Sequence, residues 1–572
     1  MKIVDEYVQY ENRKRNAVIF GGVLVVLLII LAILLAVFLP RKGDNGQGGQ
    51  GGHEHTYERK VVAQRYLKDA ANHTSGAIYY KSCECGEKGT DADTFVYGDA
   101  LHVFNKEVAT ETYLKEAATH TSKSVYYMSC ECGAKGTETF TGYYLPTDGL
   151  KYELSADETE YTLVGFDKKV TDTHIVVADQ IDGKPVTAIG DYAFNMDNTA
   201  QASEVEKPLI TSIIIPDGVT SIGNYAFNKC EGLTAIDLPD GVTSIGNKAF
   251  YGCSALESVD LPDSVTSIGK EAFAACSALT SIELPDGVTS IGDSAFAACI
   301  KLTSITLPDS LTSIGNTTFV NCFKLTNITL PDGVTSIGVA AFSGCSSLKN
   351  VKLPDGITSI GTAAFTGCSS LTDVIIPKGV TNIAESTFSG CVSLTSVTML
   401  GKVTAIGSMA FNQCEKLAAI DLPDSLTSIG SAAFQNCRSL KSITIPATLT
   451  GSSSQSVFSG CSGLTSVIIA DGVTSIGSGL FTGCSALTSI IIPASLTSVG
   501  VGAFSNTGAF AVYYKGTKAE WDSTFGQVGN TTFIGVTKYY YVENEEDVPE
   551  DGGNYWHYDT DGITPVIWTK ED

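Results

Sequence analysis

Four histidines and four cysteines near the N-terminus are the residues of this chain that are best suited to chemistry. They lie in two copies of one segment offset by 47 residues, which end in YYKSCECG (residues 79–86) and YYMSCECG (residues 126–133). Two imidazoles and two thiolates form a donor set for structural zinc. A module this small needs a stabilising metal or cross-link because it buries little apolar surface. The two copies supply His55, His73, Cys83 and Cys85, and His102, His120, Cys130 and Cys132.

The spacing of these cysteines leaves their chemistry open. Cys-x-Cys is tighter than the Cys-x-x-Cys spacing of the usual zinc knuckle. Structural zinc, disulfides and free thiols are therefore all retained as alternatives for the two modules.

The rest of the chain gives no sign of catalysis. Twelve further cysteines recur three residues after a repeated phenylalanine, and we expect them to be small buried hydrophobic residues rather than redox or metal sites. The repeat contains no histidine, and the sequence has neither a Gly-x-Ser-x-Gly elbow nor a phosphate-binding glycine loop. We therefore expect a protein that is not an enzyme.

A repeat of about 23 residues fills the middle of the chain, from residue 186 to residue 508. A fixed period in the twenties predicts a solenoid with one coil per repeat, and hence a mainly β leucine-rich repeat fold of about 14 coils. One phenylalanine marks each copy: Phe194, Phe227, Phe250, Phe273, Phe296, Phe319, Phe342, Phe365, Phe388, Phe411, Phe434, Phe458, Phe481 and Phe504.

The copy at residues 233–253 shows how one coil forms. An apolar-inward strand leads into a Pro-Asp-Gly turn at residues 239–241, and a second extended run follows at residues 242–245. Phe250 and Cys253 then return to the core. Stacked coils place equivalent residues in columns about 4.8 Å apart. One later copy has Gly-Ser-Ser-Ser in place of Ser-Ile-Gly, so we expect its second run to be irregular.

The outward column of the first strand is the candidate ligand-binding surface. It changes along the solenoid from acidic through hydroxyl-bearing to apolar residues. Three adjacent carboxylates suit Ca²⁺ or a basic partner, but simple solvation explains them as well because no backbone-carbonyl cage is evident. The candidate residues are Asp237, Asp260, Glu283, Lys352, Ile375, Asp421, Ile468 and Ile491.

An uncharged stretch at residues 17–39 predicts a single transmembrane helix. As a helix it would span about 34 Å, which is enough for a bilayer core. More basic residues precede the stretch than follow it, which favours a cytoplasmic N-terminus and an extracellular bulk at the cell membrane. The net charge of −25 argues against nucleic acid as a partner.

These features divide the chain into seven segments. They are a cytoplasmic N-terminus (1–16), a transmembrane helix (17–39), a glycine-rich linker (40–54), two tandem Cys-x-Cys modules (55–146), N-terminal cap strands (147–185), the repeats (186–508) and an aromatic C-terminal cap (509–572).

The repeat resembles the BspA-like leucine-rich repeat family of bacterial and protist surface proteins. The resemblance covers about residues 186–505 and rests on Leu-Pro-Asp-x-Val/Leu-Thr-Ser-Ile-Gly and Ala-Phe-x-x-Cys. It implies a right-handed solenoid and, in several members, adhesion to host or partner proteins. The C-terminal YYKGT and EW (residues 513–521) are similar to the caps of that family. The small modules also resemble a module of bacterial surface proteins in which cysteine often replaces His73 and His120, an exchange that suits a metal ligand.

These observations predict a membrane-anchored surface protein that binds extracellular or host proteins, or acts in adhesion, through the exposed face of the solenoid. The alternative is a glycan-binding or cell-wall-associated structural protein that uses its aromatic C-terminus.

Overall fold

The fold is taken from a computed structural model of the chain, which describes the strands between residues 67 and 141 and then residues 144–197, 208–449, 455–525, 535–551 and 553–569. The predicted membrane segment (17–39) and the eight histidines and cysteines of the two modules lie outside the described residues. Within the described ranges, no helix is both long and apolar enough to cross a membrane. The same ranges contain no group of three or more His, Cys, Asp or Glu residues placed to hold a metal ion.

Two small antiparallel sheets precede the solenoid in sequence. In each, the first strand begins with a leucine that pairs with a tyrosine, Leu67 with Tyr79 and Leu114 with Tyr126, and a register shift follows. The two pairings are thus related by the same offset as the duplicated segment. The first sheet comprises β1 (Leu67–Asp69), β2 (Ala77–Tyr80) and β3 (Thr94–Tyr97), and the second β4 (Leu114–Glu116), β5 (Val125–Ser129) and β6 (Lys135–Thr141).

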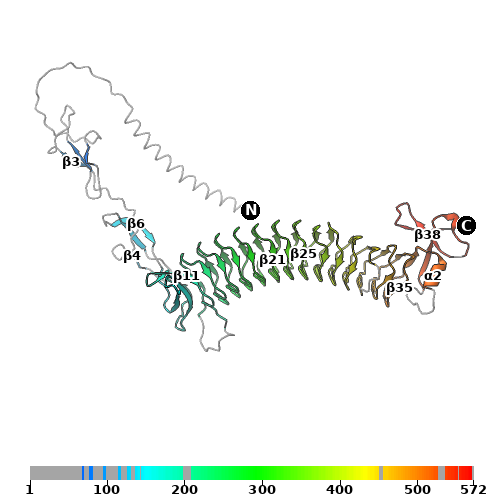
Figure 1. Cartoon of the computed structure of the whole chain (residues 1–572), viewed down its shortest axis with the longest axis horizontal. Helices are drawn as coiled ribbons and strands as arrows, with labels where there is room; N and C mark the ends of the chain where they lie inside the picture. Colours follow the sequence, from blue (N-terminus) through cyan, green and yellow to red (C-terminus); the bar gives the residue numbers. More distant parts are fainter. Residues whose placement is uncertain are drawn as a thin grey trace, which may run out of the picture. The chain divides into compact units, whose positions relative to one another are not determined.

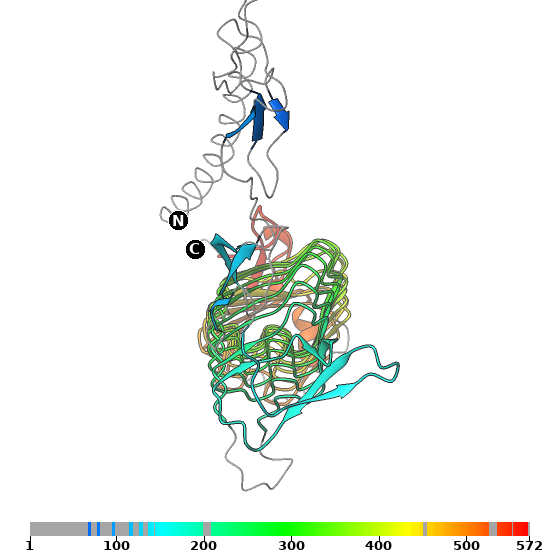
Figure 2. The same ribbon diagram turned by 90° about the vertical axis from the view of Figure 1, so that its left-hand side faces the viewer.

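The repeats form a mainly β solenoid of about 15 turns of about 23 residues, with coils stacked along one axis (Figure 1). Each regular coil adds one strand to a long-strand ladder and one to a short-strand ladder, both parallel, and the coils superimpose when viewed along the stack (Figure 2). The strands form where apolar and polar residues alternate, because one side faces the core and the other faces solvent.

The strand bounds follow the period of the sequence. The long-strand ladder contains β9 (His174–Val176), β12 (Ser212–Ile214), β14 (Ala235–Asp237), β16 (Ser258–Asp260), β18 (Ser281–Glu283), β20 (Ser304–Thr306), β22 (Asn327–Thr329), β24 (Asn350–Lys352), β26 (Asp373–Ile376), β28 (Ser396–Met399), β31 (Ser442–Ile445), β32 (Ser466–Ile469) and β34 (Ser489–Ile492). The short-strand ladder contains β11 (Lys184–Ile189), β13 (Ser221–Ile222), β15 (Ser244–Ile245), β17 (Ser267–Ile268), β19 (Ser290–Ile291), β21 (Ser313–Ile314), β23 (Ser336–Ile337), β25 (Ser359–Ile360), β27 (Asn382–Ile383), β29 (Ala405–Ile406), β30 (Ser428–Ile429), β33 (Ser475–Ile476) and β35 (Ser498–Val499).

The core is a column of stacked phenylalanines beside a column of cysteines. Neighbouring rings lie with centroids 5.0 Å apart for Phe227 and Phe250 and 5.7 Å apart for Phe458 and Phe481, with nearly parallel planes. Each repeat cysteine is buried, and its thiol donates a hydrogen bond to a phenylalanine carbonyl of the preceding coil, as Cys253 does to Phe227 at 3.1 Å. The sequence-based prediction that these cysteines are buried is therefore confirmed.

Both ends of the phenylalanine column are covered. Phe166 of β8 stacks on Phe194, and Phe510 packs on Phe504 with its ring tilted by 34°. The N-terminal strands are β7 (Leu150–Leu154), β8 (Tyr161–Phe166) and β10 (Gln180–Ile181). The C-terminal elements are β36 (Ala511–Tyr514), α2 (Lys518–Thr524), β37 (Thr537–Tyr541), η3 (Glu545–Asp547), β38 (Tyr555–Tyr558) and β39 (Pro565–Ile567).

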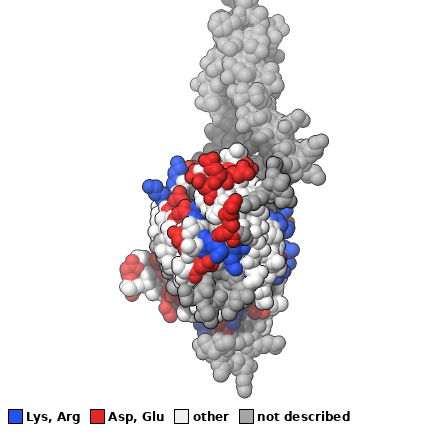
Figure 3. All heavy atoms as spheres, turned by 90° about the vertical axis from the view of Figure 1, so that its right-hand side faces the viewer, with Lys and Arg blue, Asp and Glu red and all other residues white. Residues whose placement is uncertain are grey.

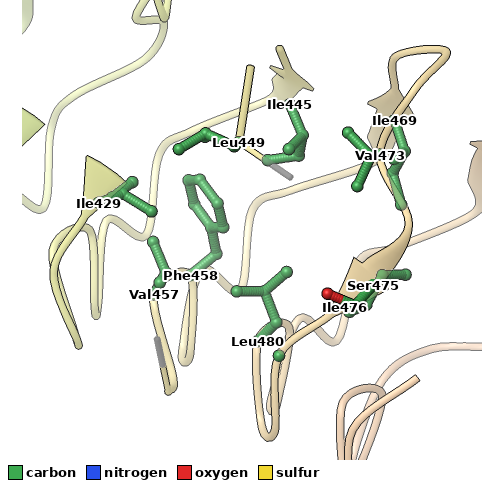
Figure 4. Close-up of a pocket in the computed structure, with 11 residues that line it drawn as sticks. Ile429, Ile445, Leu449, Val457, Phe458, Ile469, Val473, Ser475, Ile476 and Leu480 are labelled. Carbon is green, nitrogen blue, oxygen red and sulfur yellow. The ribbon is translucent and has the colours of Figure 1, made fainter. Parts of the chain in front are cut away.

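Two coils depart from the pattern. Residues 417–423 add no strand to the long-strand ladder, which is interrupted between β28 and β31. The other irregular coil is accompanied by a cavity. Within the described residues no short strand lies between β30 and β33, and residues 450–454 lie outside that range. A cavity of about 20 Å³ opens between Ile429 and Ile476, with Leu449 and Phe458 among its apolar walls (Figure 4). In the sequence, the coils on both sides have isoleucine at this position of the repeat, whereas this copy has serine.

Two positions in each phenylalanine turn after that of Phe194 have left-handed backbone angles. They lie two residues before and two residues after the phenylalanine, as at Ala340 and Gly344 around Phe342, with φ of 51° and 78°. Glycine fills the later position in about half of the coils, but Ala275 and Ala298 adopt the same angles without it. These turns therefore carry local strain that the stacking of the coils maintains.

Candidate interaction surface

The outer face of the long-strand ladder is a regular surface that runs along the solenoid. In β14 the side chain of Ile236 is buried, whereas those of Ala235 and Asp237 face solvent. Parallel pairing stacks equivalent residues on successive coils, so that Asp237 lies beside Asp260 and Glu283 beside Thr306. Charges and hydroxyls on this face therefore form columns along the solenoid.

The predicted surface residues fall into three groups. Six side chains are exposed as expected: Asp237, Asp260, Glu283, Lys352, Ile375 and Asp421. Ile468 is half-buried. The expectation that Ile491 is exposed is wrong, because its side chain is only 4% exposed. Ile491 pairs in register with Tyr513 of β36, so an aromatic residue of the C-terminal cap lies beside it.

Threonine hydroxyls on this face are partly committed to the fold. Thr303 donates to the carbonyl oxygen of Thr280 at 3.0 Å, and Thr326 donates in turn to Thr303 at 3.3 Å. The hydroxyl column thus reinforces the contact between coils.

Sequence reasoning missed several surface residues that lie just before the strands. Ile300 and Phe323 occupy a position where most copies have a small or charged residue, and they are 40% and 44% exposed. Lys301 and Lys324 follow them, and Lys349 begins the next coil's outer face. The available signal was departure from the repeat consensus, because an exposed bulky residue in place of serine is not needed to build the coil.

The thiols of the cysteine column are buried, and burial suppresses the ionisation of several of them. Burial raises the pKa of Cys253, Cys322 and Cys391 to about 12, partly offset by hydrogen bonds from neighbouring backbone groups. A thiolate is the form that binds metals and reacts with oxidants. These thiols are therefore suited to packing rather than to redox or metal chemistry.

A groove of about 600 Å³ lies in the C-terminal cap, between the loop that follows η3 and the strands β38 and β39. Tyr555 and Trp568 contribute aromatic walls, and Glu545, Glu546 and Glu550 contribute carboxylates. Figure 3 shows this end of the solenoid, where Asp and Glu side chains gather along one edge. The sequence showed the aromatic and acidic residues separately but not that they enclose a groove.

The aromatic walls of this groove are held in place by hydrogen bonds. The Trp568 indole Nε1 donates to the Val542 carbonyl at 3.0 Å, and its ring stacks on His557 at 3.9 Å. The Tyr555 hydroxyl donates to Asp551 at 2.5 Å. Burial, together with this carboxylate, raises the pKa of Tyr555 to about 12. Tyr555 therefore stays a neutral donor at physiological pH.

Comparison with known proteins gives a consistent assignment of the repeats. The family model described as "BspA type Leucine rich repeat region (6 copies)" matches residues 188–325, 312–424 and 404–538. A crystal structure of a leucine-rich repeat protein from Bacteroides ovatus is 30% identical, with a TM-score of 0.51, over 62% of this chain and 96% of that chain. A leucine-rich cell surface protein from Faecalibacterium prausnitzii is 29% identical, with a TM-score of 0.40, over 69% of this chain and 100% of that chain. A search of curated proteins gives no match.

Proposed function

Because the chain belongs to the BspA-type leucine-rich repeat family, we propose that it is a membrane-anchored surface protein that binds other proteins through the outer face of its long-strand ladder. The observation that carries the proposal is the run of strands from β14 to β28, whose outward side chains are exposed and vary in charge from coil to coil. Repeat scaffolds bind through such extended surfaces, and their invariant residues build the coil.

A binding experiment with the full chain in detergent tests this proposal. Extracellular proteins captured by the chain are compared with those captured by a variant carrying Ile375→Ser and Asp421→Ser. Both side chains are exposed on the face, so the substitutions alter the surface without disturbing the core. Loss of capture supports the proposal. Unchanged capture by this variant, together with loss of capture after changes on the short-strand ladder, would contradict it.

Attachment to the cell membrane through residues 17–39 is a separate part of the proposal. It is supported by the length of the uncharged stretch and by the basic residues before it. Protease treatment of intact cells checks the orientation, because the protease reaches the solenoid only if the solenoid lies outside the cell. Protection in intact cells with cleavage after lysis would reverse the orientation.

Glycan binding at the groove of the C-terminal cap is the second candidate function. The specific observation is the volume of about 600 Å³ lined by Trp568, Tyr555 and three glutamates. Sugar rings pack on aromatic faces while their hydroxyls donate to carboxylates. Binding to a glycan array that is lost in Trp568→Ala, but kept in the face variant above, would assign this function to the cap.

Structural zinc in the two Cys-x-Cys modules is also proposed, on the basis of their paired histidines and cysteines. Metal analysis of the full chain would find zinc, and the content would halve when Cys83 and Cys85 are replaced by serine. Absence of zinc together with unreactive thiols would indicate disulfides instead.

A further inference from the structure

Charge is segregated along the outer face of the long-strand ladder. The face segments at β14, β16 and β18 cover residues 231–237, 254–260 and 277–283, and we call them the acidic half. The next three, at β20, β22 and β24, cover residues 300–306, 323–329 and 346–352, and we call them the basic half. The acidic half carries Glu231, Asp237, Glu257, Asp260 and Glu283 and no basic residue, and the basic half carries Lys301, Lys324, Lys349 and Lys352 and no acidic residue.

These charges are exposed, and none of them forms an ion pair with another residue that the structure describes. All nine side chains are solvent-exposed. Among the ion pairs of the described residues, none involves any of the nine. Four clustered lysines are unusual in a chain with a net charge of −25. Like charges held about one strand spacing apart repel one another, so each half gains by meeting the opposite charge.

We propose that two copies of the chain pair through this face, with the acidic half of each copy against the basic half of the other. A twofold axis parallel to the strands, between Glu283 and the adjacent Thr306, brings the three acidic coils of one copy onto the three basic coils of its partner. This operation places the Asp237 coil opposite the Lys352 coil. Because an isologous interface repeats every contact twice, both halves of each copy are neutralised at once.

The apolar residues of the basic half fit the same arrangement. Ile300 and Phe323 lie on adjacent coils and are 40% and 44% exposed. The twofold operation sets their coils opposite those of Ser277 and Ser254, which carry small residues at the same position. Bulky apolar side chains therefore meet small ones across the interface, which permits close approach.

The size of the face indicates a weak association. Six coils at about 4.8 Å and seven residues at about 3.3 Å cover roughly 600 Å² on each copy. The total of about 1,200 Å² lies at the lower limit for a specific stable interface. We therefore expect dimers that form at high concentration and dissociate as salt screens the charges. The inference does not depend on the membrane anchor or on any external partner.

Sedimentation of the full chain in detergent, at several concentrations and salt levels, tests the pairing. The wild-type chain should form a salt-sensitive dimer. Lys349→Glu with Lys352→Glu should weaken it at least tenfold, because like charges then face each other. Asp237→Lys with Asp260→Lys should weaken it likewise. An equimolar mixture of the two variants should regain dimer, since each now presents the sign that the other lacks.

Two further variants separate this interface from general charge effects. Lys416→Glu with Lys441→Glu changes lysines in the columns of Lys324 and Lys349 on later coils, outside the six-coil face, and should leave the dimer intact. Phe323→Ser introduces the residue that other coils carry, so the coil should fold normally while dimerisation weakens.

Three results would overturn the pairing. The first is a wild-type chain that stays monomeric at high concentration and low salt, even if its lysines are found to bind a polyanion. The second is equal weakening of the dimer by the control pair on the later coils. The third is failure of the mixed charge variants to associate.

Discussion

In most coils the glycine at the bend before the phenylalanine turn is required by the close approach of the neighbouring coil rather than by its own backbone angles, whereas the Phe388 coil has Ala384 at this position. A Cβ on Gly361 would lie 2.6 Å from the backbone carbon of Gly338 and 2.6 Å from the nitrogen of Val339. Neither backbone atom can move without shifting its whole coil. We expect Gly361→Ala to lower the free energy of unfolding by about 1–3 kcal/mol, as measured by urea unfolding.

Gly356 is the matched control in the same coil. A Cβ there would meet its nearest atoms at 3.6 Å and 3.7 Å, which is ordinary contact, and several other copies carry serine at this position. Gly356→Ala should change the free energy of unfolding by less than about 0.5 kcal/mol. Equal losses at Gly356 and Gly361 would show that close approach between coils is not the cause.

At the left-handed turn positions, in contrast to the bend glycines, we expect glycine to be more stabilising than alanine. Ala275 and Ala298 have φ of 59° and 57° at a position where six other coils carry glycine. Ala275→Gly with Ala298→Gly should raise the free energy of unfolding by about 0.5–1 kcal/mol per site, because the Cβ clash exceeds the entropy that glycine loses. Ala297→Gly, next to one of these sites but without a positive φ, should lower it. A loss at all three positions would rule out strain relief.

At the scale of elements, the cysteine column makes the solenoid sensitive to alkali. Burial raises the pKa of Cys391 from 9.0 to about 12. Below pH 9 both folded and unfolded chains keep these protons. Above it, only the unfolded chain loses them, so stability falls until a folded thiol such as Cys391 ionises near pH 12. Each thiol whose pKa is raised in this way contributes a slope of up to about 1.4 kcal/mol per pH unit.

Urea unfolding between pH 8 and pH 10.5 checks this slope. Replacing Cys368 and Cys391 by alanine should make the fall less steep by up to about 2.8 kcal/mol per pH unit, although the variant starts less stable at pH 7. Ionising tyrosines contribute equally to both proteins and cancel in the comparison. Identical slopes for the variant and the wild type would contradict the assignment to thiols.

The irregular coil with the cavity offers a stabilising change. Substituting Ser-Ile-Gly for residues 451–454 restores the 23-residue step and supplies the isoleucine that the cavity beside Phe458 lacks. We expect the free energy of unfolding to rise by about 1–3 kcal/mol, from burial of the new side chain and loss of the cavity. A Ser-Ser-Gly replacement of equal length should give no such gain. A gain from both would indicate that loop length, rather than cavity filling, is responsible.

At the scale of the whole molecule, the residues that recur in every repeat were sufficient to predict the solenoid. The residues that occur only once did not predict where the candidate groove lies. Phe250, Cys253 and the Pro-Asp-Gly turn recur at fixed spacing, so one coil defines the rest. The groove around Trp568 could not be predicted, because it depends on how residues 545–550 fold back on β38 and β39. The burial of Ile491 likewise depends on a strand outside the repeat.

The basic half of the face could be predicted from the sequence only in part. Its lysines were visible in the sequence, but only the register of the coils shows that Lys301, Lys324 and Lys349 lie on consecutive coils next to three acidic ones. The left-handed turns were hidden because alanine, lysine and tyrosine occupy positions at which glycine would have marked them.

The interruption of the long-strand ladder between β28 and β31 has a mechanical consequence. Tension applied along the stack is resisted by the backbone hydrogen bonds that join each coil to the next, and the described residues 417–423 add no strand to this ladder. A protein stretched between two surfaces would yield there first and release the last coils and the aromatic cap as one piece. Rupture in a single-molecule pulling trace would then begin with a fixed extension set by the residues after this coil.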